Sequence, residues 1–522
     1  MDAFKQTTLL ARSVTACALI LACVVAGCAT AQQDGQPKVA AASSVRSALS
    51  KSVKKQKKAL RSVFHREPAA GPHLGQIYSR AASHHDGHRN PVIVIPGILG
   101  SRLRDADSNR VVWGSFGAGN LNPVRANDAA LLALPMQPSV PLRDLRDHDT
   151  PDSILADAKV SLFGIPIQVE AYHGILETLG VGGFQADASG RATIDSIAYG
   201  EDHFTCFEFH YDWRRDNAEN AARLGQFMRE KAEYVKAVRA QRFGVIGEPV
   251  KFDLVAHSMG GLLARYYMRY GEQQLGDDGS LPPLTWEGAR NVDLLIQVGT
   301  PNAGSPKVLQ DLVNGKRLAP FLPKYSAAIL GTMPAPYQLM PRPRHAAVVC
   351  DGHPQGVDLY DVNVWQHFGW GLLDPDQDHE LQKLLPHVET RQQRHAIAYD
   401  HVAKSLLRAK QLHQALDKPA SPPAGTSMYL VAGDSIDTTS RLAVNPQTGR
   451  LSELARAPGD GTVLRTSALM DERLSDSVPW QPKLVSPVNW RHTTFIFASH
   501  EGLTSDPGFT DNVLNLLLES PR

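Results

Sequence analysis

Short apolar runs alternate with amphipathic helical patterns over residues 90–522. Apolar runs of four to eight residues are typical of buried strands, and they predict strands at Val92–Ile95, Phe207–Tyr211, Phe252–Val255, Leu294–Val298, Met428–Val431 and Thr493–Phe497. Apolar positions at helical spacing predict helices over Asn217–Ala240, Met259–Tyr270 and Asp511–Glu519, the last with Asp511 as its N-cap. Strands that alternate with helices indicate an α/β fold with a mostly parallel sheet and helices on both faces.

Two stretches depart from this alternation. Residues 302–425 are too long for a connecting loop and contain aromatic and helical segments, so we expect an inserted cap within a catalytic domain at 90–522. Residues 28–89 show no apolar period and are predicted to form a flexible tether. Its basic run at 51–61 fits either contact with anionic lipid or a solvated linker. His84, His85 and His88 lie in the same tether and are interpreted as linker residues rather than metal ligands.

The N-terminus has the pattern of a bacterial export signal. Lys5 and Arg12 precede an apolar run at 14–26, which is too short to span a bilayer comfortably. The run ends in Val-Ala-Gly-Cys28, which resembles a lipoprotein cleavage site. We therefore expect a signal peptide at 1–27 and a lipid-modified Cys28 that anchors an exported protein to a cell-envelope membrane, the outer one being favoured by Ala29. A simple secretion signal with a chance cysteine is the alternative.

Composition narrows the class of function. The 54 Lys and Arg balance 53 Asp and Glu, so no overall field attracts nucleic acid. A hydrophobic content of 43% is sufficient for a sizeable core. Without the signal segment and Cys28, only Cys206 and Cys350 remain, and the sequence leaves open whether they pair. No P-loop, dinucleotide-binding glycine pattern or metal motif is present, so no cofactor is predicted.

Candidate chemistry begins at Ser258. The predicted strand at Phe252–Val255 breaks onto Ala256-His-Ser258-Met-Gly260 and continues into a helix. This is the pattern of a nucleophile elbow, in which a tight strand-to-helix turn exposes the serine hydroxyl and tolerates only small residues two positions away. Ala256 and Gly260 meet that requirement. An ordinary turn with a bystander serine is the structural alternative.

A serine nucleophile needs an imidazole base and a carboxylate that orients the imidazole. On an α/β-hydrolase sheet these follow the serine in the order acid, then base. His500 ends the last predicted strand and is the expected base, whereas His492 begins that strand and His257 adjoins the serine, so both are assigned structural roles. For the acid, the spacing leaves Asp460 and Asp434 open, with Asp460 favoured.

Two backbone N–H groups must also face the oxyanion of the tetrahedral intermediate. One is expected from Met259, the residue after the nucleophile. The other is expected from the Pro96–Ser101 loop after the first predicted strand, where Ile98 is the predicted donor. Read alone, Pro-Gly after a strand is only a turn.

Five motifs in this order resemble the lecithin:cholesterol acyltransferase family of α/β-hydrolases. They are Pro91–Leu103, Tyr211-Asp-Trp-Arg214, Ala256–Gly261, Gly459–Val463 and the His500 segment. The resemblance implies Ser258 as nucleophile, Asp460 as acid, His500 as base, and Ile98 and Met259 at the oxyanion hole. It also implies that Trp113 contacts lipid from a mobile lid. The disulfide that closes this lid in animal relatives has no counterpart here, because the chain has no Cys between 28 and 206, and a buried core Trp113 is the alternative.

These observations predict a membrane-tethered serine esterase or acyltransferase whose partner is a lipid or phospholipid. Two alternatives stay open. The first is an esterase or thioesterase for small soluble substrates. The second is a non-catalytic lipoprotein that uses the fold as a binding scaffold.

Overall fold

The computed structural model describes Tyr78, Ala81 and residues 87–114, 121–154, 205–317, 323–350, 353–475, 478–500 and 502–520, together with short strand backbones between 160 and 197. The predicted signal peptide, Cys28, His84, His85 and most of the predicted tether lie outside these residues. Among the described helices, none combines the length and the apolar composition that crossing a bilayer requires.

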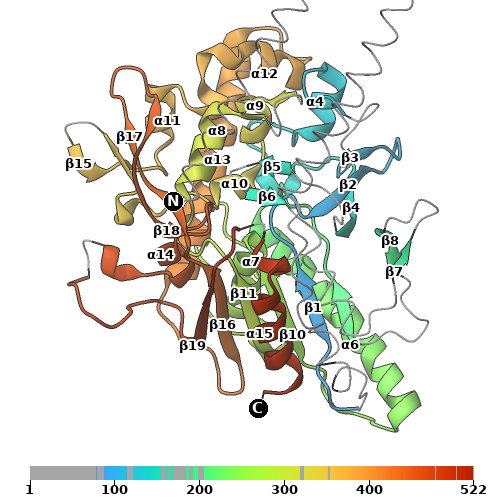
Figure 1. The fold of residues 1–522 in the computed structure, drawn as a ribbon. Helices are drawn as coiled ribbons and strands as arrows, with labels where there is room; N and C mark the ends of the chain where they lie inside the picture. Colours follow the sequence, from blue (N-terminus) through green and yellow to red (C-terminus); the bar gives the residue numbers. More distant parts are fainter. Residues whose placement is uncertain are drawn as a thin grey trace, which may run out of the picture. The chain divides into compact units, whose positions relative to one another are not determined.

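In the part of the chain that the structure describes, six parallel strands form the central sheet (Figure 1). Their order is β19-β16-β11-β10-β1-β9, and every neighbouring pair is parallel. The strands are β1 (Val92–Ile95), β9 (Cys206–Glu208), β10 (Phe252–His257), β11 (Val292–Val298), β16 (Ser427–Gly433) and β19 (Trp490–Ile496). The chain runs outward from β1 to β9 and then returns to β10. Ligands of open α/β sheets bind at the carboxyl ends of the strands beside such a reversal.

Helices cover both faces of this sheet, which confirms the predicted fold class. The helices α6 (Asn217–Phe243), α7 (Met259–Tyr270) and α13 (Arg391–Asp417) form one layer, in which α7 packs against the other two. Helix α15 (Pro507–Leu518) lies against the opposite face, in front of the strands in Figure 1. Gly271, with φ 61°, ends α7 where the sequence predicted.

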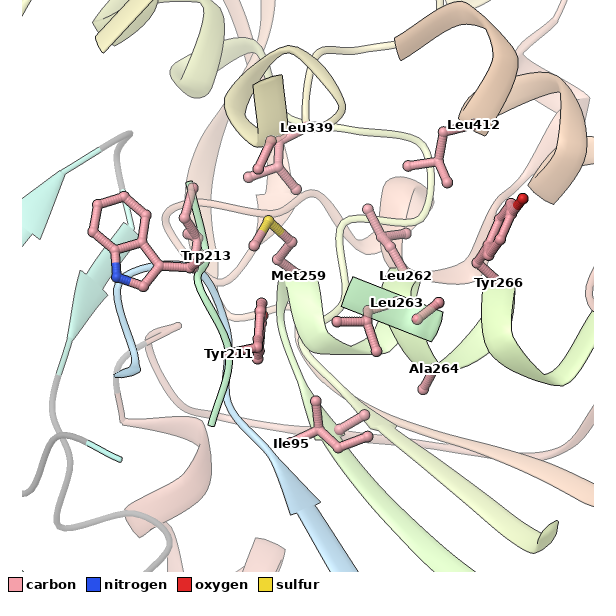
Figure 2. Close-up of a cluster of buried hydrophobic side chains, with 14 of the residues drawn as sticks. Ile95, Tyr211, Trp213, Met259, Leu262, Leu263, Ala264, Tyr266, Leu339 and Leu412 are labelled. Atoms are coloured by element: carbon pink, nitrogen blue, oxygen red, sulfur yellow. The ribbon is translucent and has the colours of Figure 1, made fainter. Parts of the chain in front are cut away.

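Helix α7 is buried on all sides. Figure 2 shows Met259 and Leu263 of this helix between Ile95 of β1 and the side chains of Leu339 and Leu412, and all five are fully buried. Burying an aliphatic side chain of this size contributes roughly 1.5–3 kcal/mol to the free energy of unfolding. The element that follows Ser258 is therefore held rigidly between the sheet and the region after β11.

The region between β11 and β16 is largely helical. It contains α8 (Pro306–Asn314), α9 (Ala327–Gly331), α10 (Pro334–Tyr337), α11 (Val362–Phe368), α12 (Asp378–Leu384) and α13. Figure 1 shows α8, α9 and α12 beyond the carboxyl ends of the central strands. Helix α13 returns to the sheet layer, where the Ala415 carbonyl accepts a hydrogen bond of 2.9 Å from Tyr270 Oη. The region thus covers the sheet's carboxyl edge and also supplies a helix to its layer.

Smaller sheets flank the central one and were not predicted. The hairpin β17 (Ile436–Val444) and β18 (Leu451–Gly459) joins β14 (Val348–Cys350) and β15 (His353–Gly356) in the order β15-β14-β17-β18. A three-stranded sheet contains β2 (Ser101–Asp105), β3 (Val111–Trp113) and β4 (Asp149–Ile154). Further elements include α4 (Ala126–Leu132), α14 (Arg465–Leu469) and the pairs β5 (Val160–Leu162) with β6 (Ile165–Ile167), β7 (Phe184–Ala186) with β8 (Ala192–Ile197), and β12 (Lys316–Arg317) with β13 (Lys324–Tyr325).

The predicted start of the last helix was wrong. Helix α15 begins at Pro507, and the Asp506 side chain caps it by accepting a hydrogen bond of 2.8 Å from the Gly508 N–H. Asp511 lies inside the helix and accepts a hydrogen bond of 2.7 Å from Tyr78 Oη. Proline is favoured in the first turn of a helix, where its missing N–H costs nothing, so Asp506-Pro507 is the true start signal.

Candidate active site

Ser258 lies at the turn between β10 and α7, in a backbone conformation that few residues adopt. Its φ is 51° and its ψ is −123°, and its N–H donates a hydrogen bond of 2.8 Å to the Val298 carbonyl of β11. A Cβ atom on Gly260 would lie 2.5 Å from the Pro96 carbonyl oxygen. The small residue that the sequence pattern required is therefore needed because the turn packs directly against the loop after β1.

The structure brings Ser258, His500 and Asp460 together from three separate loops. His500 Nε2 lies 3.1 Å from Ser258 Oγ, and His500 Nδ1 lies 2.7 Å from Asp460 Oδ2. All three residues are at most 2% exposed. The predicted acid, base and nucleophile thus form one continuous hydrogen-bonded chain at the carboxyl edge of the sheet.

Backbone donors fix the Asp460 carboxyl group. Its Oδ1 accepts hydrogen bonds from the N–H groups of Thr462 at 3.0 Å and Val463 at 2.7 Å, which leaves Oδ2 for His500. The His500 N–H also donates to the Asp460 carbonyl oxygen at 2.8 Å, which ties the two loops together. A carboxylate can only accept from Nδ1, so it favours the tautomer with the proton on Nδ1. Nε2 is then a lone-pair acceptor facing the Ser258 hydroxyl.

The predicted oxyanion donors flank the serine. Met259 is the first residue of α7, and Ile98 lies in the loop between β1 and β2; both are fully buried. A Cβ atom on Gly97 would lie 2.8 Å from Ser258 Cβ, so this loop passes within contact distance of the nucleophile. The structure thus brings Met259 and the loop that carries Ile98 beside Ser258, where an oxyanion hole is required.

The rival candidates lie elsewhere or are paired differently. Asp434 forms an ion pair with Arg465 at 3.4 Å, and the exposed His492 lies at the amino end of β19. The His257 ring packs 5.1 Å from the His500 ring, centroid to centroid. Burial, followed by repulsion from His500, lowers the pKa of His257 to about 3. His257 is therefore neutral at ordinary pH, and no fixed positive charge from it opposes an imidazolium on His500.

Trp113 is a core residue in this structure. Its side chain is 2% exposed, its ring packs edge-to-face on Trp213 with centroids 5.1 Å apart, and its Nε1–H donates a hydrogen bond of 2.9 Å to the Leu99 carbonyl. The structure therefore places Trp113 in the buried position that the sequence analysis held as the alternative to a lipid-contacting lid residue.

The described cysteines and histidines form no disulfide and no metal site. Cys206 and Cys350 are free thiols, and burial raises the pKa of Cys206. His88 pairs with Glu248 at 3.2 Å. Within the described ranges, no group of three or more His, Cys, Asp or Glu side chains is arranged to bind a metal ion.

Sequence reasoning missed the residues that support the acid loop. Ser305 Oγ donates a hydrogen bond of 2.7 Å to the Thr462 carbonyl, and Lys307 Nζ donates one of 3.0 Å to the Gly461 carbonyl. Burial, followed by the charge of Lys316, lowers the pKa of Lys307. Both donors lie at the start of α8, about 155 residues before the loop that they contact. No local pattern links such distant segments.

Residues 193–373 match the family of lecithin:cholesterol acyltransferase. The match confirms the resemblance that the five motifs indicated. The matched segment includes Ser258, Met259 and the Tyr211–Arg214 motif, whereas Ile98, Asp460 and His500 lie outside it and are brought to the site by the fold. A search of curated proteins finds no match.

Solved structures with a similar fold include a chain of the crystal structure of a Tle4-Tli4 complex. It superposes with a TM-score of 0.50 at 15% identity, over 83% of this chain and 100% of that chain. Two structures of the Bacillus licheniformis lipase BlEst2 also match at 11% identity. The propeptide form has a TM-score of 0.29 over 84% of this chain and 52% of its own, and the mature form has 0.28 over 84% and 94%.

Proposed function

We propose that this protein is a serine-dependent lipid acyl-ester hydrolase or acyltransferase that works through an acyl-enzyme on Ser258. The family match supports a lipid ester hydrolase or acyltransferase in general terms. The observation that carries the proposal is the hydrogen-bonded chain from Asp460 through His500 to the Ser258 hydroxyl. A serine hydroxyl is inert at neutral pH unless such a base removes its proton.

In the proposed reaction, Ser258 Oγ attacks the ester carbonyl carbon while His500 Nε2 takes the hydroxyl proton. Asp460 stabilises the imidazolium that forms. The N–H groups of Met259 and Ile98 donate to the oxyanion, and losing one donor of this kind costs about 2.7–4 kcal/mol in other serine hydrolases. The intermediate collapses when the ester C–O bond breaks and His500 protonates the leaving alcohol. Water or another alcohol then attacks the acyl-enzyme carbonyl while His500 takes its proton. The bond between the acyl carbon and Ser258 Oγ breaks, His500 returns the proton to Ser258 Oγ, and the acyl group leaves as an acid or a new ester.

Labelling with a fluorophosphonate tests the catalytic assignment. Wild-type protein should be labelled covalently, and Ser258→Ala should not, because phosphorus is attacked by the same activated oxygen. Equal melting temperatures for the two proteins would show that the variant is folded. Equal labelling of wild type and variant, or no labelling of either, would contradict the proposal.

The substrate class rests on the family match and needs its own test. We expect turnover of long-chain esters in micelles or phospholipid vesicles to exceed that of short soluble esters or thioesters. A preference for short soluble substrates would favour the alternative of a small-molecule esterase. Product analysis with a labelled phospholipid, with and without an added alcohol, separates hydrolysis from acyl transfer.

We also propose that the protein is an exported lipoprotein anchored through Cys28. The support is the sequence of the first 28 residues alone. Two or more acyl chains anchor a protein stably, because each buried methylene contributes about 0.8 kcal/mol. Cells that express the full chain with a palmitate analogue should yield a labelled membrane protein. Incorporation of the label into Cys28→Ser would contradict this anchor.

A further inference from the structure

The loop that carries Ile98 adopts a conformation that its own residues do not favour. It runs from Pro96 to Gly100 and leads into Ser101, the first residue of β2, and Leu99 has a φ of 69°. Non-glycine residues occupy this left-handed region at a cost in conformational free energy, and they persist there when surrounding contacts hold them. The loop therefore needs partners outside itself to keep its shape.

Three buried aromatic side chains supply those contacts. Tyr211 Oη donates a hydrogen bond of 2.9 Å to the Pro96 carbonyl. Trp113 Nε1–H donates one of 2.9 Å to the Leu99 carbonyl, and Trp213 Nε1–H donates one of 3.2 Å to the Ser101 carbonyl. We call Tyr211, Trp113 and Trp213 the aromatic clamp. Each is at most 2% exposed, so these bonds are shielded from competing water.

The clamp holds the two ends of the segment that aims the Ile98 N–H. That N–H belongs to the peptide group between Gly97 and Ile98, whose carbonyl oxygen accepts a hydrogen bond of 3.1 Å from the Gly100 N–H. A trans peptide group is planar, so its N–H points opposite to its C=O. Fixing the Gly97 carbonyl therefore fixes the direction of the Ile98 N–H. The bond to the Pro96 carbonyl holds the peptide group just before this one, and the bond to the Leu99 carbonyl holds the peptide group two positions after it.

The clamp is itself anchored in the fold. The rings of Trp113 and Trp213 pack edge-to-face with centroids 5.1 Å apart. Between Tyr211 and Trp213 in the sequence, Asp212 accepts from Arg214 Nε at 3.0 Å and Nη2 at 2.8 Å, in the buried interior. The N–H of Tyr211 also donates to Ser101 Oγ at 3.1 Å. The clamp and the loop thus form one interlocked unit.

We propose that the aromatic clamp positions the oxyanion loop, so that Tyr211, Trp113 and Trp213 act on catalysis through the Ile98 N–H without touching substrate. This inference rests on the proposed function, because it assumes that an oxyanion forms beside Ser258. It also gives Trp113 a role distinct from lipid contact. A positioning residue of this kind should affect the transition state more than the bound substrate.

Two conservative substitutions test the clamp, and the chain offers a matched control for each. Tyr211→Phe removes one oxygen atom, and Trp113→Phe removes the indole donor. Tyr337→Phe is the control for the first, because the buried Tyr337 Oη donates to the Gly331 carbonyl at 3.0 Å in the helical region. Trp365→Phe is the control for the second, because the buried Trp365 Nε1–H donates to the Leu359 carbonyl at 3.0 Å.

We expect kcat to fall by about 10- to 100-fold in the clamp variants, with KM within about threefold of wild type, since a misplacement of about 1 Å can cost 100-fold in rate. Affinity for a trifluoromethyl ketone, which forms an oxyanion on the serine, should fall by the same factor. The control variants should lower the melting temperature similarly but leave kcat and inhibitor affinity near wild type.

Three outcomes would overturn the inference. Equal losses of kcat in clamp and control variants would indicate general destabilisation. Unchanged kcat and inhibitor affinity in Tyr211→Phe would show that the loop keeps its shape without the clamp. A raised KM with unchanged kcat in Trp113→Phe would indicate substrate contact. Failure of the proposed function is distinguishable, because wild type would then resist fluorophosphonate labelling or Ser258→Ala would retain activity.

Discussion

At the scale of single residues, Asp460 shows how the fold pairs a buried charge. Its carboxyl oxygens accept from two backbone N–H groups and from His500 Nδ1, and the residue is 2% exposed. A buried carboxylate without such donors would be strongly disfavoured. The bond between Asp460 Oδ2 and His500 Nδ1 also orients the His500 ring. The hydrogen bonds that stabilise the buried carboxylate therefore also position the proposed base.

Asp460→Asn should separate the role of Asp460 in orienting His500 from its role in folding. The asparagine keeps an acceptor oxygen for the Thr462 and Val463 N–H groups, so the melting temperature should change little. Its amide cannot stabilise an imidazolium, so kcat should fall by up to about 10⁴-fold, the loss seen when the acid of a Ser-His-Asp triad is replaced by Asn. Steady-state kinetics with a chromogenic ester measures this.

Asp434→Asn is the matched control for that substitution. It removes an ion pair with Arg465 that is partly exposed, and such pairs contribute only about 0–1 kcal/mol to stability. Its kcat should stay within a few-fold of wild type. Comparable losses in both variants would mean that the acid has been misassigned.

The sequence identifies Ser258 and His500 from local patterns, but it does not separate Asp460 from Asp434. Both acids directly follow a glycine. The structure separates them through the unpredicted hairpin β17–β18, which follows Asp434 and ends next to Asp460. Only this three-dimensional return of the chain brings the Asp460 carbonyl within 2.8 Å of the His500 N–H. The resemblance to the family, and not the spacing of the two residues, is what predicts Asp460 rather than Asp434 as the acid.

At the scale of elements, α13 shows why helices in this molecule are hard to delimit by apolar period alone. Its buried face includes polar residues such as His401, Gln411 and His413. His401 Nε2 lies 2.9 Å from the Thr332 carbonyl, and His413 Nε2 lies 2.8 Å from the Gln338 carbonyl. Hydrogen bonds to the preceding helices therefore replace part of the apolar stripe that a sequence reading looks for.

Buried histidines on α13 should make stability depend on pH. Burial lowers the pKa of His401 from 6.5 to about 4, with a smaller opposing effect from the bond to Thr332 and a further lowering by Lys404. Because the unfolded chain binds this proton more readily, the stabilisation is complete above pH 6.5 and is lost as the pH falls toward 4. His401 alone should lower the free energy of unfolding by on the order of 2 kcal/mol between pH 7 and pH 5.

Urea titrations at pH 7 and pH 5 measure this loss. His401→Gln keeps an N–H donor for the Thr332 carbonyl but cannot be protonated, so its loss between the two pH values should be smaller than that of wild type. His492→Gln, at an exposed position on β19, is the control and should retain the wild-type loss. Identical pH dependence in His401→Gln and wild type would show that another group is responsible.

At the scale of the whole molecule, parallel strands give the described domain two unlike edges. Because β1, β10, β11, β16 and β19 all run the same way, the residues after each strand gather at one edge and those before each strand at the other. Ser258, Asp460 and His500 lie on the first edge. Because Ser258 and His500 follow two of these strands, β10 and β19, the predicted strands alone place both residues at one edge, whereas Asp460 follows β18 of a flanking sheet.

The two edges also carry exposed apolar residues, which allows a test of how lipid reaches the site. Phe497 follows β19, three residues before His500, and is 87% exposed; Ile246 precedes β10 at the opposite edge and is 82% exposed. If the carboxyl edge contacts a lipid surface, Phe497→Ser removes a side chain whose burial contributes roughly 1.5–3 kcal/mol, so activity on phosphatidylcholine vesicles should fall by about 10-fold or more. Hydrolysis of a monomeric short-chain ester should stay within twofold of wild type, because the reacting groups are untouched.

Ile246→Ser is the control and should leave both activities near wild type. Equal effects of Phe497→Ser on vesicles and on the soluble ester would mean that Phe497 acts on the site itself. Equal vesicle losses in the two variants would mean that lipid contact is not confined to the edge that carries Ser258 and His500.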